Sequence, residues 1–196
     1  MRLGDFLIKR VVSLLATEIP SLKNFATLSP IPGFVKWLTS AIDHNDFPIF
    51  TREQQLSLDS VQDALRNPDW YQSEELRQQL EPVLSQLCFY YLTSVKTGDR
   101  ISDPVANFHL SNGARVEQIQ FLANTRADGL AQSLGMMVNY RYVLDYIEDN
   151  HDAYVHEGHV EIYKTCLLYT SPSPRDQRGS RKTGYGWKKK KGGGGG

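Results

Sequence analysis

Apolar residues recur at the three- and four-residue spacing of a helix face in the first part of the chain. Between residues 3 and 15 this spacing predicts a helix, with Asp5 placed to cap its start and Pro20 to end it. A second helix is expected directly after Gly33. Its apolar face consists of Phe34, Trp37, Leu38, Ala41 and Ile42.

The middle of the chain predicts further helices. One is expected over residues 51–66, followed by a turn at 67–69, and another begins at Ser73 and continues to Tyr91. Because a proline lacks the backbone N–H of a helix interior, Pro82 should kink this last helix or divide it in two. We interpret the whole region as core packing and a lid.

Three shorter stretches have the alternating or buried character of strands: residues 22–28, 114–122 and 136–143. In the second of them Val116 breaks strict alternation. Two helices are expected after the second and third strands, over residues 125–134 and 144–154. The first of these helices has a Thr125-x-x-Asp128 capping box and is ended by Gly135.

The chain changes character after residue 165. Residues 166–196 carry no periodic apolar face and end in a run of lysines and then of glycines. The peptide 166–176 resembles the translation of a transposase end and adapter used in DNA-library preparation. We therefore interpret residues 166–196 as a disordered tail and a sequencing artefact, and exclude them from functional reasoning.

Excluding this tail changes the charge of the protein. The whole chain holds 22 basic and 22 acidic residues, but residues 1–165 hold fourteen against twenty-one, a net charge of −7. Such an acidic body argues against nonspecific binding to nucleic acid, which needs clustered cations. The same residues contain one cysteine, Cys88, and therefore no intrachain disulfide. No apolar run is long enough to predict a membrane span.

Two short segments carry candidate chemistry. Within residues 103–114, His109 stands in a turn-rich stretch with an Asn112-Gly113 pair, which is typical of functional loops and of structural turns alike. Ser29 stands at the expected carboxyl end of a strand, where ligands bind in sheets flanked by helices, and it equally fits a turn or helix cap. From the residues alone both alternatives stay open. Three further histidines have no zinc-ligand spacing, so no metal site is expected at His151, His156 and His159.

Four segments of the sequence resemble malonyl-CoA decarboxylase in the order and spacing of that family. They are residues 3–12, 28–34, 104–114 and 137–142, the third reading PVANFHLSNGA. The resemblance covers residues 2 to about 158. Four long segments in register make it specific, whereas one alone would only be suggestive.

The resemblance implies a helix-rich α+β or α/β fold, namely a partial GNAT-like (acyl-CoA N-acyltransferase-like) domain with the first part of its sheet missing. Residues 1–165 would form the C-terminal part of the family's catalytic domain, truncated at the N-terminus. In the parent protein an all-helical domain that supports homo-oligomerisation would precede it. The implied reaction converts malonyl-CoA to acetyl-CoA and carbon dioxide in fatty-acid metabolism, without a metal or organic cofactor.

The resemblance also implies roles for individual residues. Ser29 and His109 match the family's catalytic serine and histidine, and Tyr142 matches a tyrosine of the same active site. His109 would protonate the enolate left by decarboxylation, and Ser29 would orient the malonyl carboxylate. The end of the loop that binds the coenzyme A pyrophosphate is matched by Arg2, Leu3, Gly4 and Asp5, although Arg2 stands where some members carry an acid.

Because the loop's beginning and the preceding strands are missing, we expect the 196-residue polypeptide to be inactive by itself. The compartment would be the cytoplasm in a bacterium, and the mitochondrion, peroxisome or cytosol in a eukaryote. Two alternatives remain: an acyl-CoA acyltransferase of the same fold, and a noncatalytic helical interaction fragment around residues 73–91.

Overall fold

The computed structural model describes residues 3–22, 24–44, 61–63 and 66–164. Arg2, the tail 166–196 and most of the helix expected over residues 51–66 lie outside the described residues. The described elements are α1 (Leu3–Glu18), β1 (Phe25–Pro30), α2 (Phe34–His44), the 3-10 turn η1 (Trp70–Gln72), α4 (Glu74–Ser94), β2 (Lys96–Thr97), β3 (Arg100–Ile101), α5 (Pro104–Ser111), β4 (Arg115–Gln120), α6 (Ala127–Ser133), β5 (Met137–Tyr142), the 3-10 turn η2 (Leu144–Tyr146) and α7 (Ile147–Glu157).

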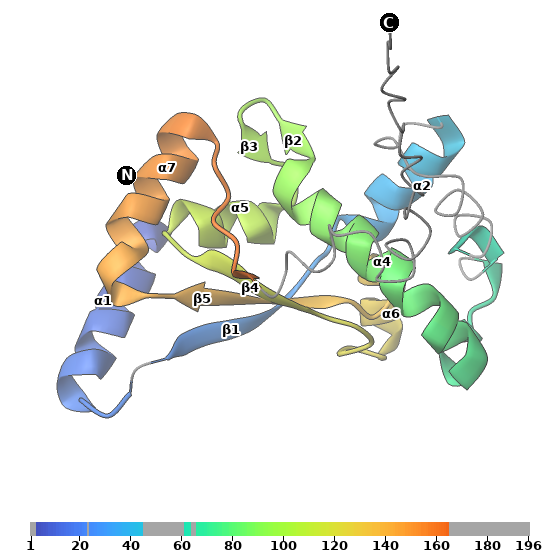
Figure 1. Ribbon diagram of the computed structural model, residues 1–196, viewed down its shortest axis with the longest axis horizontal. Helices are drawn as coiled ribbons and strands as arrows, with labels where there is room; N and C mark the ends of the chain where they lie inside the picture. The colour runs from blue at the N-terminus through green and yellow to red at the C-terminus, as the bar shows by residue number, and fades with distance from the viewer. Residues whose placement is uncertain (1–2, 23, 45–60, 64–65, 165–196) are drawn as a thin grey trace, which may run out of the picture.

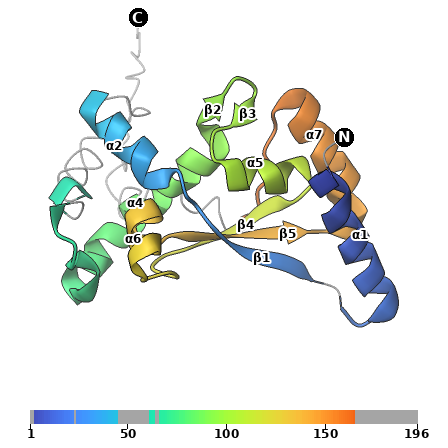
Figure 2. The same ribbon diagram turned by 180° about the vertical axis from the view of Figure 1, so that it is seen from behind.

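A three-stranded antiparallel sheet with the order β1-β5-β4 forms the centre of the molecule. Helices α4 and α5 lie on one side of this sheet, α6 lies in the connection between β4 and β5, and α1 and α7 lie at the opposite end (Figures 1 and 2). The fold is therefore helix-rich α+β, as expected. Among the described helices, none combines the length and the apolarity needed to cross a bilayer.

The core lies between the sheet and α4. On β5 the side chains alternate, so that Val138, Tyr140 and Tyr142 are buried while the residues between them are only half-buried. Fully buried leucines of α4 pack into the same cluster, and each such side chain stabilises the fold by about 1.5–3 kcal/mol. These leucines are Leu80, Leu84, Leu87 and Leu92.

A β-bulge explains the broken alternation of β4. The pairing with β5 shifts register between Val116 and Gln118, which inserts Glu117 as an extra residue. As a result Val116 and Ile119 both face the core, although they are three positions apart. The strand prediction is confirmed, and its apparent irregularity is the bulge.

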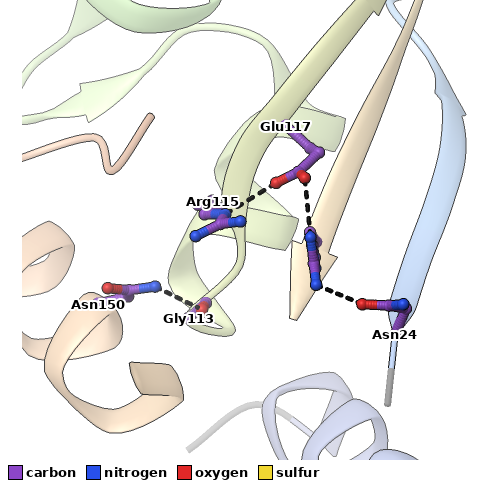
Figure 3. Close-up of polar contacts among 6 residues, drawn as sticks. Asn24, Gly113, Arg115, Glu117 and Asn150 are labelled. Atoms are coloured by element: carbon purple, nitrogen blue, oxygen red, sulfur yellow. Dashed lines mark hydrogen bonds and ion pairs between the residues drawn. The ribbon is translucent and has the colours of Figure 1, made fainter. Parts of the chain in front are cut away.

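A polar cluster joins the three strands on the face opposite the core. Glu117 of the bulge pairs with Arg115 at 2.8 Å and with Arg141 of β5 at 3.0 Å, and Arg141 reaches Asn24 just before β1 (Figure 3). Further along the sheet, Asn139 donates to the Thr27 carbonyl at 2.9 Å. Because a one-residue slip would break these contacts, the cluster fixes the register that places the buried side chains of β1 and β5 together.

Several predicted helix boundaries are wrong. Helix α1 already begins at Leu3, so position 5 lies inside the helix and not at its N-cap. Helix α6 begins at Ala127 with Arg126 at the N-cap and no side-chain cap, so Thr125 does not form the expected capping box. The last helix is preceded by the 3-10 turn η2, and α7 ends at Glu157, directly before Gly158, which adopts the left-handed conformation at φ 65°.

Of the two expected effects of Pro82, a kink in the helix or its division in two, the division is wrong, because α4 continues through Pro82. A proline in a helix interior costs about 3 kcal/mol or more. Leu80 and Leu84 on either side of it are fully buried, and their packing against the core offsets this cost.

The short β2–β3 hairpin that follows α4 was not predicted. Gly98 lies in its turn and adopts a positive φ of 63°.

Candidate active site

Ser29 lies on the core-facing side of β1, one residue before the strand ends. Phe25, Thr27 and Ser29 alternate with more exposed residues, and Ser29 pairs in register with Val138 of β5. The Ser29 side chain is buried, and its Oγ lies 2.9 Å from Oγ1 of Thr27. The serine therefore points toward the helices that cover the sheet and not toward solvent.

His109 lies on helix α5, which corrects the expectation of a turn-rich segment. The carboxylate of Asp103 caps this helix by accepting the N–H groups of Val105 and Ala106, at 3.0 and 2.9 Å. Pro104 follows at the first helical position, where its missing N–H carries no penalty. An acidic cap followed by proline is a helix-start signal that was present in the sequence and overlooked.

The end of α5 is held as firmly as its start. Gly113 follows the helix in the left-handed region with φ 79°, and a Cβ at this position would lie 2.0 Å from the Ile147 carbonyl oxygen of α7. The Asn150 side chain of α7 donates to the Gly113 carbonyl at 3.3 Å (Figure 3). Only glycine fits this turn, which fixes the last turn of α5, where His109 lies, against α7.

Both ring nitrogens of His109 have a hydroxyl partner. Nε2 lies 3.1 Å from Oγ of Ser29, and Nδ1 lies 2.7 Å from the phenolic oxygen of Tyr142 on β5. Ser29, His109 and Tyr142 were all predicted as site residues, and the structure brings the three together from β1, α5 and β5. The hydroxyls and the imidazole form a continuous hydrogen-bonded chain, which can hold and pass a proton.

Aromatic rings surround this chain. The ring of Tyr140 stacks on the imidazole of His109 with centroids 4.5 Å apart and an angle of 20° between the planes, and Phe108 contacts it edge-on. Burial lowers the pKa of His109 to about 4, so the imidazole is neutral near pH 7. Burial likewise raises the pKa of the Tyr142 phenol, which keeps its proton. Tyr140 and Thr27 were not predicted as parts of the site.

The residues matched to the coenzyme A loop are not part of the hydrogen-bonded group formed by Ser29, His109 and Tyr142. Leu3, Gly4 and Asp5 form the first turn of α1, at the same end of the sheet as α7 (Figure 1), and Arg2 lies outside the described residues. The first N–H groups of a helix have no partner within it and suit phosphate oxygens. The assignment of these four residues to coenzyme A remains a prediction.

Metal ligands do not gather among the described residues. No group of three or more His, Cys, Asp or Glu side chains there has the geometry to hold an ion. Two of the three histidines mentioned above have other contacts. His151 lies 2.5 Å from the Ser111 carbonyl oxygen, and His159 lies 3.4 Å from a carboxylate oxygen of Glu161.

Comparison with known proteins identifies close relatives. Residues 1–171 match the family model described as malonyl-CoA decarboxylase C-terminal domain. A mitochondrial malonyl-CoA decarboxylase of Mus musculus is 39% identical, the match covering 85% of this chain and 37% of the mouse protein. Its counterpart from Anser anser anser is 37% identical over 87% of this chain and 37% of the goose protein.

Solved structures give the same result. Malonyl-CoA decarboxylase from Rhodopseudomonas palustris superposes with a TM-score of 0.78 at 37% identity, over 86% of this chain and 38% of that one. The enzyme from Agrobacterium vitis also gives a TM-score of 0.78 at 37% identity, over 87% of this chain and 41% of that one. The chain spans about 37% of the length of the curated relatives that it matches.

Proposed function

The chain belongs to the malonyl-CoA decarboxylase family, which confirms the resemblance, and on that premise we propose that it supplies the catalytic dyad of such an enzyme. The reaction would convert malonyl-CoA to acetyl-CoA and carbon dioxide. The observation that carries the proposal is the buried chain of hydrogen bonds from Ser29 through His109 to Tyr142. The roles of its members follow from the chemistry.

Decarboxylation breaks the bond between the carboxylate carbon and the α-carbon. Carbon dioxide leaves, and the electron pair stays on the thioester as an enolate, which needs one proton at the α-carbon to become acetyl-CoA. Hydrogen-bond donors near the thioester oxygen lower the barrier by stabilising the enolate. The enzyme must therefore place a proton donor beside the α-carbon and hold the departing carboxylate in a fixed direction.

His109 would be the proton donor. It is neutral in the free protein because burial lowers its pKa to about 4. The carboxylate of a bound malonyl group would favour the imidazolium form, so that His109 gains a proton when substrate binds and gives it to the enolate. Tyr142, which contacts the other ring nitrogen, would align the imidazole during this transfer.

Ser29 would orient the substrate. Its hydroxyl lies within hydrogen-bond distance of His109, and from there it can donate to the malonyl carboxylate. The first turn of α1, with Leu3, Gly4, Asp5 and the preceding Arg2, would bind the coenzyme A pyrophosphate through backbone N–H groups. The whole scheme uses hydrogen bonds and one titratable side chain, so the proposed reaction needs no metal or organic cofactor.

The chain represents only part of the length of its relatives, so the proposal concerns the parent protein. We expect the 196-residue chain to turn over malonyl-CoA far more slowly than the full-length parent, in which an upstream helical domain would support oligomerisation. Turnover by the chain comparable with that of the parent would contradict this expectation.

The experiment that tests the proposed function is incubation of the parent with malonyl-CoA alone. Acetyl-CoA formed without any acceptor supports decarboxylation, whereas formation that requires an amine or thiol would support an acyltransferase.

A further inference from the structure

The carboxylate of Asp103 connects three elements of the structure. Its Oδ1 caps α5, while its Oδ2 accepts the backbone N–H of Gly33 at 3.3 Å, and the Tyr91 hydroxyl of α4 also donates to the carboxylate. Asp103 is fully buried. It is therefore in contact with the helix that carries His109, the loop that follows Ser29 and the long helix of the core.

Helix capping alone does not account for this residue. One oxygen is sufficient to cap α5, and serine or asparagine caps a helix about as well as aspartate does. A buried carboxylate is costly unless it is fully hydrogen-bonded, and burial raises the pKa of Asp103 while the surrounding donors oppose that shift. The second oxygen, Oδ2, accepts the Gly33 N–H and is the part that a simpler cap would lack.

Gly33 is tightly coupled to Ser29. The segment between them is short and contains Pro30 and Pro32, whose rings fix their own backbone angles. Ile31 is completely buried and its carbonyl accepts the N–H of Phe34 at 3.3 Å, so this turn is anchored. A hydrogen bond that holds Gly33 therefore also restricts where Ser29 lies.

His109 is coupled to Asp103 in the same way. The two residues are joined by the eight-residue helix α5, whose first turn is closed by the bond from the Asn107 N–H to the Asp103 carbonyl at 2.9 Å. The contacts thus form a closed ring, which leads from Asp103 along α5 to His109, across to Ser29 and through Gly33 back to Asp103. A Cβ at position 33 would lie 2.2 Å from the Tyr91 hydroxyl oxygen, so a larger residue there would have to displace the Tyr91 side chain.

We propose that Asp103 is a positioning residue for the dyad: its second carboxylate oxygen holds the Ser29 loop against the N-terminus of α5 and so sets the distance between Ser29 and His109. The kcat measurements that test this inference rest on the proposed decarboxylase function, whereas the chemical modification of His109 does not. Displacements of about 1 Å between reacting groups can lower a rate by about a hundredfold, so loss of this contact should reduce kcat.

The test replaces Asp103 by serine in the full-length parent protein. Serine keeps a cap for α5 but is too short to reach Gly33. We expect kcat to fall by about tenfold or more while KM changes by no more than about twofold. A matched control is Ser73→Ala, which removes the side-chain cap of α4 at Leu76 and should lower the melting temperature without lowering kcat.

Two further measurements separate positioning from general damage. In a Ser29→Ala background, Asp103→Ser should reduce kcat by no more than about twofold, because the distance that it controls no longer matters. The rate at which diethyl pyrocarbonate modifies His109, followed by peptide mass spectrometry, should rise by about threefold or more in Asp103→Ser. This second readout needs no turnover, and it decides the question even if the parent proves not to be a decarboxylase.

Unchanged kcat and unchanged His109 reactivity in a folded Asp103→Ser protein would overturn the proposal. So would an equally large loss of kcat in the Ser29→Ala background, since that result indicates damage unrelated to the dyad. If the serine variant does not unfold cooperatively, Asp103→Asn takes its place with the same outcomes. An asparagine that caps α5 through its carbonyl oxygen presents its NH2 group to the Gly33 N–H, so it keeps the cap and loses the contact with Gly33.

Discussion

The phenolic oxygen of Tyr142 lies 2.7 Å from Nδ1 of His109, on the ring edge away from Ser29. Since burial raises the pKa of this phenol, it remains protonated and can donate to Nδ1. The neutral imidazole then carries its own proton on Nε2, the nitrogen that faces Ser29. A phenol that donates to Nδ1 would select this tautomer, and the contact would hold the plane of the ring.

Replacement of Tyr142 by phenylalanine should therefore reduce kcat by about tenfold in the parent protein, because the imidazole loses its orienting hydrogen bond. The buried ring remains, so the melting temperature should change little. The matched control is Tyr146→Phe, which removes a phenol that is exposed at the surface. Equal kcat for both variants would show that the contact between Tyr142 and His109 has no catalytic role.

Replacement of Ser29 by alanine should lower kcat/KM for malonyl-CoA by about tenfold to a hundredfold. A hydrogen bond to a charged group contributes about 1.5–3 kcal/mol, and the malonyl carboxylate would lose one. Steady-state kinetics measure the change, with the exposed Ser40→Ala as control. An unchanged kcat/KM in Ser29→Ala would exclude this serine from substrate orientation.

The stability of the protein should depend on pH through His109. Its folded-state pKa is lowered to about 4, whereas an unfolded histidine titrates near pH 6.5, so the unfolded state takes up the proton first as the pH falls. The stabilisation from the neutral, buried histidine is complete above about pH 6.5 and is lost between about pH 6.5 and 4, by up to about 3 kcal/mol.

Urea unfolding at several pH values between 7 and 4 measures this effect. His109→Asn should reduce the loss of unfolding free energy over that interval, and His156→Asn, at an exposed position, should leave it as in the original protein. An identical pH dependence in the original protein and His109→Asn would contradict the lowered pKa of His109.

Tyr140 offers a test of the stacking contact. Its buried hydroxyl has no hydrogen-bond partner among the described residues, while its ring stacks on His109. Tyr140→Phe should be neutral or stabilising, because an unpaired buried hydroxyl costs about 1–3 kcal/mol. Tyr140→Leu should destabilise by roughly 1–3 kcal/mol and lower kcat, since the imidazole loses its support. Thermal unfolding of both variants measures these effects. A large loss of stability in Tyr140→Phe would contradict the account, because it would show that the hydroxyl has a hydrogen-bond partner.

Local sequence signals predicted most of the elements because they act over a few residues. The alternation around Phe25 predicted a strand over residues 22–28, which overlaps β1 at Phe25–Pro30, and the apolar stripe from Ser73 to Tyr91 placed α4. Two failures of the local rules have their reason in long-range packing. Burial of Leu80 and Leu84 carries α4 through Pro82, and pairing with β5 creates the bulge at Glu117, neither of which can be deduced from neighbouring residues alone.

In the candidate site, too, local signals reveal individual residues, while the contacts between them depend on the fold. A histidine in residues 103–114 and a serine at 29 are visible in the sequence, but nothing local says that they meet, because 80 positions separate them. The resemblance to a family was needed to pair them. The stacking of Tyr140 and the double role of Asp103 depend on side chains from separate elements, so they emerge only from the fold.

The most direct test of the dyad is the rate of acetyl-CoA formation from malonyl-CoA, without an acceptor, in the parent protein and in its His109→Asn variant. We expect acceptor-free turnover in the parent and a loss of at least about a hundredfold in the variant, with a melting temperature close to that of the parent. Turnover by a folded His109→Asn protein at the parental rate would contradict the assignment of His109 as the proton donor.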